Sequence, residues 1–217
     1  MSADFETIME KKIPEINFFS ASGASIRPGS VLESLDKDIE YGYLPKYIKD
    51  HDQFKEMNFD TIEEPYNIFA QDISGEVEFG AAAKFMKLVG LKFDGHKNYK
   101  IKFEITGITA KRFKEDIQAL DLELALAELK KSNKKIFKKF KKHFLVMKAL
   151  YANEYKVTVE VEKGGSFEAD VNVQSVEVEG SAHFKKKENS LLVSQNSSVP
   201  FGVIGYKIKS GTLKEID

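Results

Sequence analysis

The chain has 217 residues, of which 42% are hydrophobic and 31% are charged, and its formal net charge is −1. This length and composition suit one folded domain and exclude the globally basic class of nucleic-acid-binding proteins. The absence of cysteine excludes disulfides, thiolate metal sites and cysteine nucleophiles.

The first part of the chain is predicted to form short elements joined by turns. In order they are a helix over 3–12, a strand from Ile16 to Phe19, a loop over 20–29, a strand from Val31 to Leu35, a turn from Asp36 to Gly42 and a helical turn around Tyr47. The segment from Met1 to Glu6 has neither the basic region nor the apolar core of a signal peptide, and no stretch of 18 apolar residues occurs. We therefore expect a protein that is made and kept in the reducing cytoplasm.

A long period-two pattern runs from Gly75 to Phe93 and resumes at Tyr99 after the turn-forming residues Asp94, Gly95 and His96. Side chains alternate between the two faces of a strand, so this pattern predicts a hairpin with one apolar and one charged face. The apolar positions are Val77, Phe79, Ala81, Ala83, Phe85, Tyr99, Ile101, Phe103 and Ile105.

Residues 111–142 are predicted to be helical, because Phe113, Ile117, Leu120, Leu124 and Leu129 recur at helical spacing among good helix formers. The pair Ser132-Asn133 is expected to divide this segment into two helices.

A second period-two unit follows, interrupted by the turn-forming residues Lys163-Gly164-Gly165. We expect a strand from Leu145 to Val161 and a partner strand from Phe167 to Val178, which together form a second hairpin. Further strands are expected over 191–193 and 199–209. The apolar positions of the second hairpin are Tyr155, Val157, Val159, Val161, Phe167, Ala169, Val171 and Val173.

The expected fold is therefore α+β, with a twisted, mostly antiparallel sheet, helices packed on it and two long amphipathic hairpin regions. Such hairpins either cover the core of a soluble domain or line the wall of a membrane barrel. The period-two pattern alone is compatible with both.

Residues that would carry catalysis or bind a metal are sparse. The four histidines, at 51, 96, 143 and 183, have no partner at metal-ligand spacing. The segment from Asp36 to Glu40 begins like a calcium loop, but Tyr41 and Tyr47 occupy the positions that require glycine and glutamate. No phosphate-binding, dinucleotide-binding or serine-hydrolase motif occurs, so we expect neither an enzyme nor a bound cofactor or metal.

A block of eight lysines lies within residues 130–142. Interspersed aromatic residues would form one stripe on a helix, a composition typical of segments that lie on an anionic membrane surface. The alternative is a solvated helix face whose phenylalanines reach the core, and we weigh the two equally; RNA binding is less favoured, because no base-stacking motif accompanies the block. The lysines are Lys130, Lys131, Lys134, Lys135, Lys138, Lys139, Lys141 and Lys142.

Three segments, in this order along the chain, resemble the pore-forming domain of the gasdermin family. They are Asp72-Ile73-Ser74-Gly75-Glu76-Val77-Glu78, Phe144-Leu145-Val146-Met147-Lys148-Ala149-Leu150, and Ser197-Ser198-Val199-Pro200-Phe201-Gly202-Val203-Ile204-Gly205-Tyr206-Lys207-Ile208-Lys209. The resemblance spans roughly residues 15–210, through patterns rather than through an invariant signature.

The resemblance implies a domain that binds acidic phospholipid, assembles into a homo-oligomeric ring and inserts four strands per subunit in cell death or defence. The inserting regions would be residues 74–106 and 155–178. Burial in lipid of the seventeen apolar side chains named above would contribute about 20–30 kcal/mol per subunit. The protein would be cytoplasmic and move to the membrane on activation.

The chain also departs from the family pattern. We expect one pore-forming domain over 1–217 without the C-terminal inhibitory domain that family members usually carry, which leaves a separate inhibitor or activating partner open. The basic first helix of the family is matched only by Lys11 and Lys12. The alternative function is that of a soluble relative that keeps the fold, does not insert, and acts as an interaction or regulatory protein.

Overall fold

The computed structural model describes residues 5–18, 26–34, 37–49, 51–66, 73–78, 91–92, 99–161, 174–175, 182–187, 190–195 and 200–214. Their elements are α1 (Phe5–Lys12), β1 (Asn17–Phe18), β2 (Ser30–Ser34), β3 (Lys37–Tyr43), α2 (Pro45–Ile48), the 3-10 turn η1 (Asp52–Phe54), β4 (Thr61–Pro65), β5 (Ile73–Glu78), β6 (Leu91–Lys92), β7 (Tyr99–Phe113), α4 (Ala119–Ser132), α5 (Lys134–Phe140), β8 (Phe144–Val161), β9 (Gln174–Ser175), β10 (Ala182–Lys187), β11 (Ser190–Gln195), β12 (Gly202–Lys209) and β13 (Thr212–Lys214).

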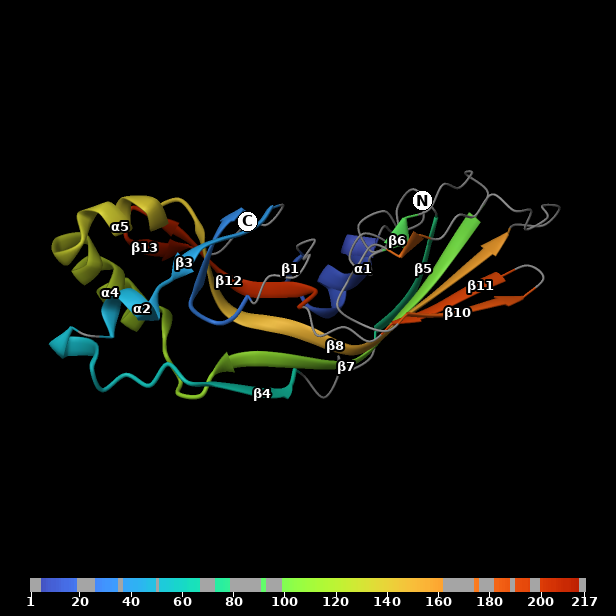
Figure 1. The fold of residues 1–217 in the computed structure, drawn as a ribbon, viewed down its shortest axis with the longest axis horizontal. Helices are drawn as coiled ribbons and strands as arrows, with labels where there is room; N and C mark the ends of the chain where they lie inside the picture. Colours follow the sequence, from blue (N-terminus) through green and yellow to red (C-terminus); the bar gives the residue numbers. More distant parts are fainter. Residues whose placement is uncertain are drawn as a thin grey trace.

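Eleven of the described strands form one long sheet built around β7 and β8 (Figure 1). These two strands, of 15 and 18 residues, pair antiparallel from Tyr99 opposite Val161 to Arg112 opposite Lys148. In one half of the sheet, β5 pairs with β7, β11 pairs with β8, and β10 pairs with β11. In the other half, β4 pairs with β7 and β12 pairs with β8.

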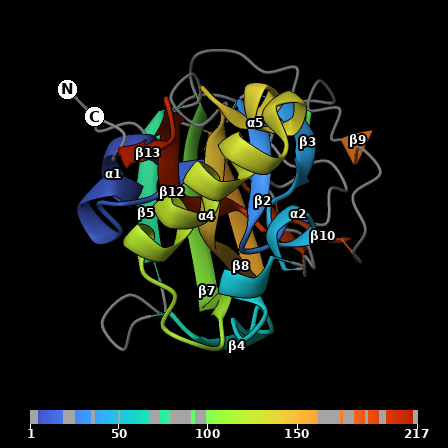
Figure 2. The same cartoon turned by 90° about the vertical axis from the view of Figure 1, so that its left-hand side faces the viewer.

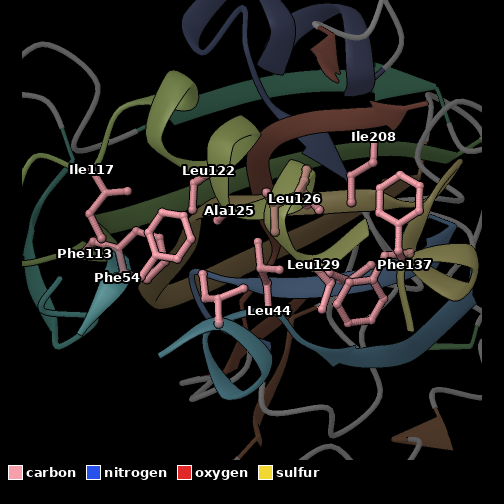
Figure 3. Close-up of a cluster of buried hydrophobic side chains, with 14 residues drawn as sticks. Leu44, Phe54, Phe113, Ile117, Leu122, Ala125, Leu126, Leu129, Phe137 and Ile208 are labelled. Carbon is pink, nitrogen blue, oxygen red and sulfur yellow. The ribbon is translucent and has the colours of Figure 1, made fainter. Parts of the chain in front are cut away.

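The helices α4 and α5 cover the second half of the sheet, and in the turned view they lie in front of β7 and β8 (Figure 2). The inward face of α4 carries Leu122, Ala125, Leu126 and Leu129, spaced three and four residues apart as one side of a helix requires. These side chains belong to a core that also receives residues from β7, α5 and β12 (Figure 3).

The helix α1 covers the first half of the sheet. Its apolar side chains Phe5, Met9 and the following Ile13 are 1%, 0% and 0% exposed. The ring of Phe5 meets that of Phe103 on β7 edge to face, with the centroids 5.0 Å apart. A four-residue spacing of apolar positions therefore places α1 directly on the apolar face of the central strands.

Several sequence predictions are confirmed by the described elements. The first helix, the strand near Val31, the helical turn at Tyr47 and the long strand ending at Val161 form as expected. The predicted break after Ser132 is also correct, because Asn133 ends one helix and begins the next. Its backbone N–H donates to Leu129 O at 2.8 Å, and its side-chain Oδ1 accepts from Ile136 N at 3.2 Å.

Two predicted elements are wrong. The segment from Asp36 to Gly42 is not a turn, because residues 37–43 form β3, which pairs antiparallel with β2. The predicted helix over 111–142 starts too early, because β7 continues to Phe113 between β4 and β8. Pairing on both edges of a strand outweighs local helix propensity.

The two predicted hairpin regions are described only in part. In the first region, β5 pairs antiparallel with β7, with Ile73 opposite Ile105 and Val77 opposite Ile101. In the second region, residues 155–160 have β7 on one edge and β11 on the other. A strand has only two edges, so both edges of residues 155–160 are occupied. The predicted partner over 167–173 lies outside the described residues.

Candidate membrane-binding site

The lysine block of residues 130–142 covers the end of α4, all of α5 and the turn that leads to β8. All eight lysine side chains are exposed. Within the described residues, one of them forms an ion pair: Lys131 Nζ lies 3.1 Å from Glu128 Oε2. The block is therefore a concentrated positive surface that carboxylates of the described chain barely neutralise.

The phenylalanines within the lysine block and directly after it are buried. Phe137, Phe140 and Phe144 are 5%, 1% and 3% exposed. Phe140 packs edge to face on Tyr47 at 5.5 Å, and the ammonium group of Lys130 lies 5.8 Å from the ring centre of Phe137. In this conformation the phenylalanines belong to the core, as the second of the two sequence interpretations expects, and only the lysines face outward.

The helix α4 carries two exposed apolar side chains, Leu120 and Leu124, which are 64% and 46% exposed. The spacing of these leucines predicts a helix here, and α4 confirms it. Apolar residues occur on both sides of this helix, so the pattern alone does not show which side packs on the sheet.

The apolar face of the central strands is also buried. The described side chains from the predicted membrane-inserting set are Ile101 (0%), Phe103 (1%), Ile105 (0%), Tyr155 (2%) and Val157 (1%). Burial raises the pKa of Tyr155, whose ring packs edge to face on Phe201 at 6.2 Å. The alternation predicted from the sequence is thus confirmed for these five positions, which here form core.

The opposite face of the same strands carries a network of ion pairs across β5, β7 and β8. Lys102 Nζ lies 2.8 Å from Glu160 Oε2, and Lys156 Nζ lies 3.2 Å from Glu154 Oε2 and 3.7 Å from Glu104 Oε2. The hydrogen bond from Lys102 to Glu160 raises the pKa of Lys102. This face is therefore charged, internally paired and in contact with water.

The other residues predicted to insert divide into two groups. Val77, Tyr99, Val159 and Val161 lie in β5, β7 and β8. The remaining positions lie outside the described residues: Phe79, Ala81, Ala83, Phe85, Phe167, Ala169, Val171 and Val173.

The lysine block and the described strands of the predicted inserting regions lie at opposite ends of the long sheet (Figure 1). The block precedes Phe144 at the start of β8, whereas Val161 and Tyr99 meet at the other end. An 18-residue strand is about 60 Å long when straight. The structure therefore brings the lysines together with one another and does not bring them to the described apolar residues of the hairpin regions.

The packing of α1 on the apolar strand face was not among the sequence predictions. The spacing of Phe5, Met9 and Ile13 was a signal that could have identified this packing.

Among the described residues, no helix combines the length and apolar character needed to cross a bilayer. No group of three or more His, Asp and Glu side chains in the described part of the chain could hold a metal ion.

Comparison with known proteins identifies the family. The sequence model described as the Bacterial Gasdermin Family matches residues 20–211. Among solved structures, the chain is similar to a bacterial gasdermin from Bradyrhizobium tropiciagri, with 13% identity, a TM-score of 0.46, and coverage of 96% of this chain and 90% of the other. No curated protein matches the chain. Because the family match covers most of its length, the chain belongs to the bacterial gasdermin family.

Proposed function

We propose that this protein forms pores in membranes: it binds acidic phospholipid, assembles into a ring of identical subunits and inserts β-strands. Membership of the gasdermin family supports a pore-forming role in general. The observation that carries the specific proposal is the separation of faces on β7 and β8, where apolar side chains fill one face and ion pairs cover the other. A barrel wall with lipid on one side and a water-filled lumen on the other needs this arrangement.

The strand lengths also support the proposal. A membrane-crossing strand needs about 9–11 residues, and β7 and β8 contain 15 and 18. The unpaired edges of an isolated hairpin would leave backbone amides without partners in hydrocarbon, so insertion requires closure into an oligomer.

The driving force differs from the value expected from the sequence. The five described apolar side chains are at most 2% exposed, so moving them from the core to lipid removes almost no apolar area from water. The favourable free energy of insertion must therefore come largely from other residues and from the hydrogen bonds of the closed ring. The inserting regions over 74–106 and 155–178 stay a prediction.

We propose further that the lysine block binds lipid headgroups before insertion. Strands that stand upright in a bilayer would carry the block up to about 60 Å from the end that inserts. Headgroup contact by the block therefore belongs to a surface-bound stage, reached when the cytoplasmic protein moves to the membrane. Lysines near an anionic surface each contribute about 1 kcal/mol to such binding.

The charged face predicts how the pore selects ions. Lys102→Gln leaves Glu160 without its partner on the lumen side, so we expect the leak to become more cation-selective. Glu160→Gln removes the carboxylate that pairs with the ammonium group of Lys102, so it is expected to shift selectivity toward anions. The reversal potential in planar bilayers under a salt gradient measures both shifts. Shifts of the same sign, or loss of all leakage in both variants, would contradict a lumen position for this face.

The second candidate is a relative that keeps the fold without inserting. The burial of Phe103, Tyr155 and Val157 favours it, because a sheet with one face on a core and one in water explains these positions fully. If this second candidate is right, the protein stays a monomer or forms a defined complex in the presence of every lipid.

Release of a trapped dye from liposomes separates the two candidates. A pore-forming protein releases the dye from vesicles that contain phosphatidylserine or cardiolipin, and releases less from phosphatidylcholine vesicles. Intact vesicles of all compositions, together with a monomeric protein after incubation, would favour the non-inserting relative.

A further inference from the structure

The half of the sheet that contains the predicted inserting strands has five described strands, in the spatial order β5, β7, β8, β11, β10. Each neighbouring pair is antiparallel. Strand direction therefore alternates along the row, and the two outer strands, β5 and β10, run in the same direction. Among the described residues, each of these outer strands has one partner and one open edge.

An odd number of strands conflicts with closure into an antiparallel ring. When copies are placed side by side with the same orientation, β10 of one copy meets β5 of the next in the same direction, so every junction would be parallel. Parallel pairs are slightly less stable per residue, and bacterial membrane barrels use even numbers of antiparallel strands. With β10 removed, the outer strands would be β5 and β11, and the junction would be antiparallel.

The strand β10 also has the character of a protective edge. It is six residues long and ends in Lys185, Lys186 and Lys187. Short edge strands rich in lysine prevent one sheet from adding to another, because pairing would bring like charges together. The neighbouring strand β11, with the sequence SLLVSQ, has no charged residue and would make a favourable edge once uncovered.

We propose that β10 is a removable cover on the subunit interface, and that its release from β11 lets β11 pair antiparallel with β5 of a second copy. This inference rests on the proposed pore-forming function and names the surface that the assembly uses. In this arrangement each subunit contributes the row β5, β7, β8, β11, whose pairing already exists in the structure.

Disulfide staples test the proposal, because the natural chain has no cysteine. Ser194 lies opposite His183 on β10 and opposite Lys156 on β8. The double variant His183→Cys/Ser194→Cys would lock the cover, whereas Lys156→Cys/Ser194→Cys would lock a pair that we expect to persist in the pore. Opposite residues in antiparallel strands lie about 4.5–5.5 Å apart at Cα, within the range of disulfides.

Each variant is compared with its own reduced form in dye release from acidic liposomes and in negative-stain images of rings. We expect the oxidised His183→Cys/Ser194→Cys protein to release no dye and to form no rings. Reduction of the disulfide is expected to restore both dye release and rings. The oxidised Lys156→Cys/Ser194→Cys protein is expected to release as much dye as its reduced form does.

Equal leakage from the oxidised and reduced forms of His183→Cys/Ser194→Cys would overturn the proposal. Loss of leakage in both oxidised variants would also overturn it, because β11 would then have to leave β8 as well. If the unmodified protein releases no dye from acidic liposomes, the result counts against the proposed function instead. The two failures are therefore distinguishable.

Discussion

The double substitution Lys138→Glu/Lys139→Glu is expected to abolish most binding to liposomes rich in phosphatidylserine. Each reversal removes an attraction of about 1 kcal/mol and adds a comparable repulsion, so the dissociation constant should rise on the order of 10²–10³-fold at low salt. Both side chains are exposed on α5, and their removal leaves the buried Phe137 and Phe140 in place. Co-sedimentation with liposomes at two salt concentrations measures the change.

A matched control reverses two exposed lysines outside the block, Lys55 and Lys114. It changes the net charge by the same amount, so general electrostatics predicts the same loss, whereas a specific lysine surface predicts a much smaller one. Binding of the unmodified protein should also weaken with added salt, because screening shortens the reach of surface charges. Equal losses in both double variants would refute a headgroup site at this block.

The substitution Phe103→Ala is expected to lower the free energy of unfolding by about 3–5 kcal/mol. Its side chain is 1% exposed, and its ring packs edge to face against Phe5 at 5.0 Å. Truncation leaves a cavity between α1 and the sheet, which the surrounding side chains fill only in part. Urea unfolding followed by circular dichroism measures the loss.

The neighbouring substitution Lys102→Gln serves as the control, because Lys102 points to the other face and its side chain is 47% exposed. Loss of a surface ion pair costs about 0–1 kcal/mol. A comparable loss of stability in the two variants would show that the two faces of β7 do not differ in burial, contrary to the structure.

Much of the fold could be predicted because its signals are local. The alternation around Phe103 and Val157 places their side chains on one face whatever strand pairs beside them. The break at Asn133 could also be predicted, because a residue that satisfies the ends of two helices acts within a few positions of the chain. These features needed no knowledge of long-range contacts.

Other strand partners could not be predicted, because strand pairing depends on residues that are far apart in the sequence. The sequence alone did not predict that β11 pairs with residues 155–160 of β8. The strand β3 was mistaken for a turn for the same reason, since its polar sequence forms a strand only through pairing with β2.

The lysines of the candidate site and the apolar side chains around them differ in how well the sequence predicts their environment. Eight exposed lysines could be predicted from composition, because long charged side chains are rarely buried. The environment of Phe137, Phe140 and Leu124 depends on which side of each helix packs on the sheet. That choice is made by tertiary contacts, which the spacing of apolar residues on these helices does not determine.

Negative-stain imaging of acidic liposomes incubated with the purified protein, combined with dye release from the same sample, tests membrane insertion most directly. We predict rings of subunits on phosphatidylserine or cardiolipin vesicles and release of the dye as the rings appear. Vesicles that keep their dye, with protein that stays monomeric on every acidic lipid tested, would contradict insertion of the β5, β7 and β8 strands.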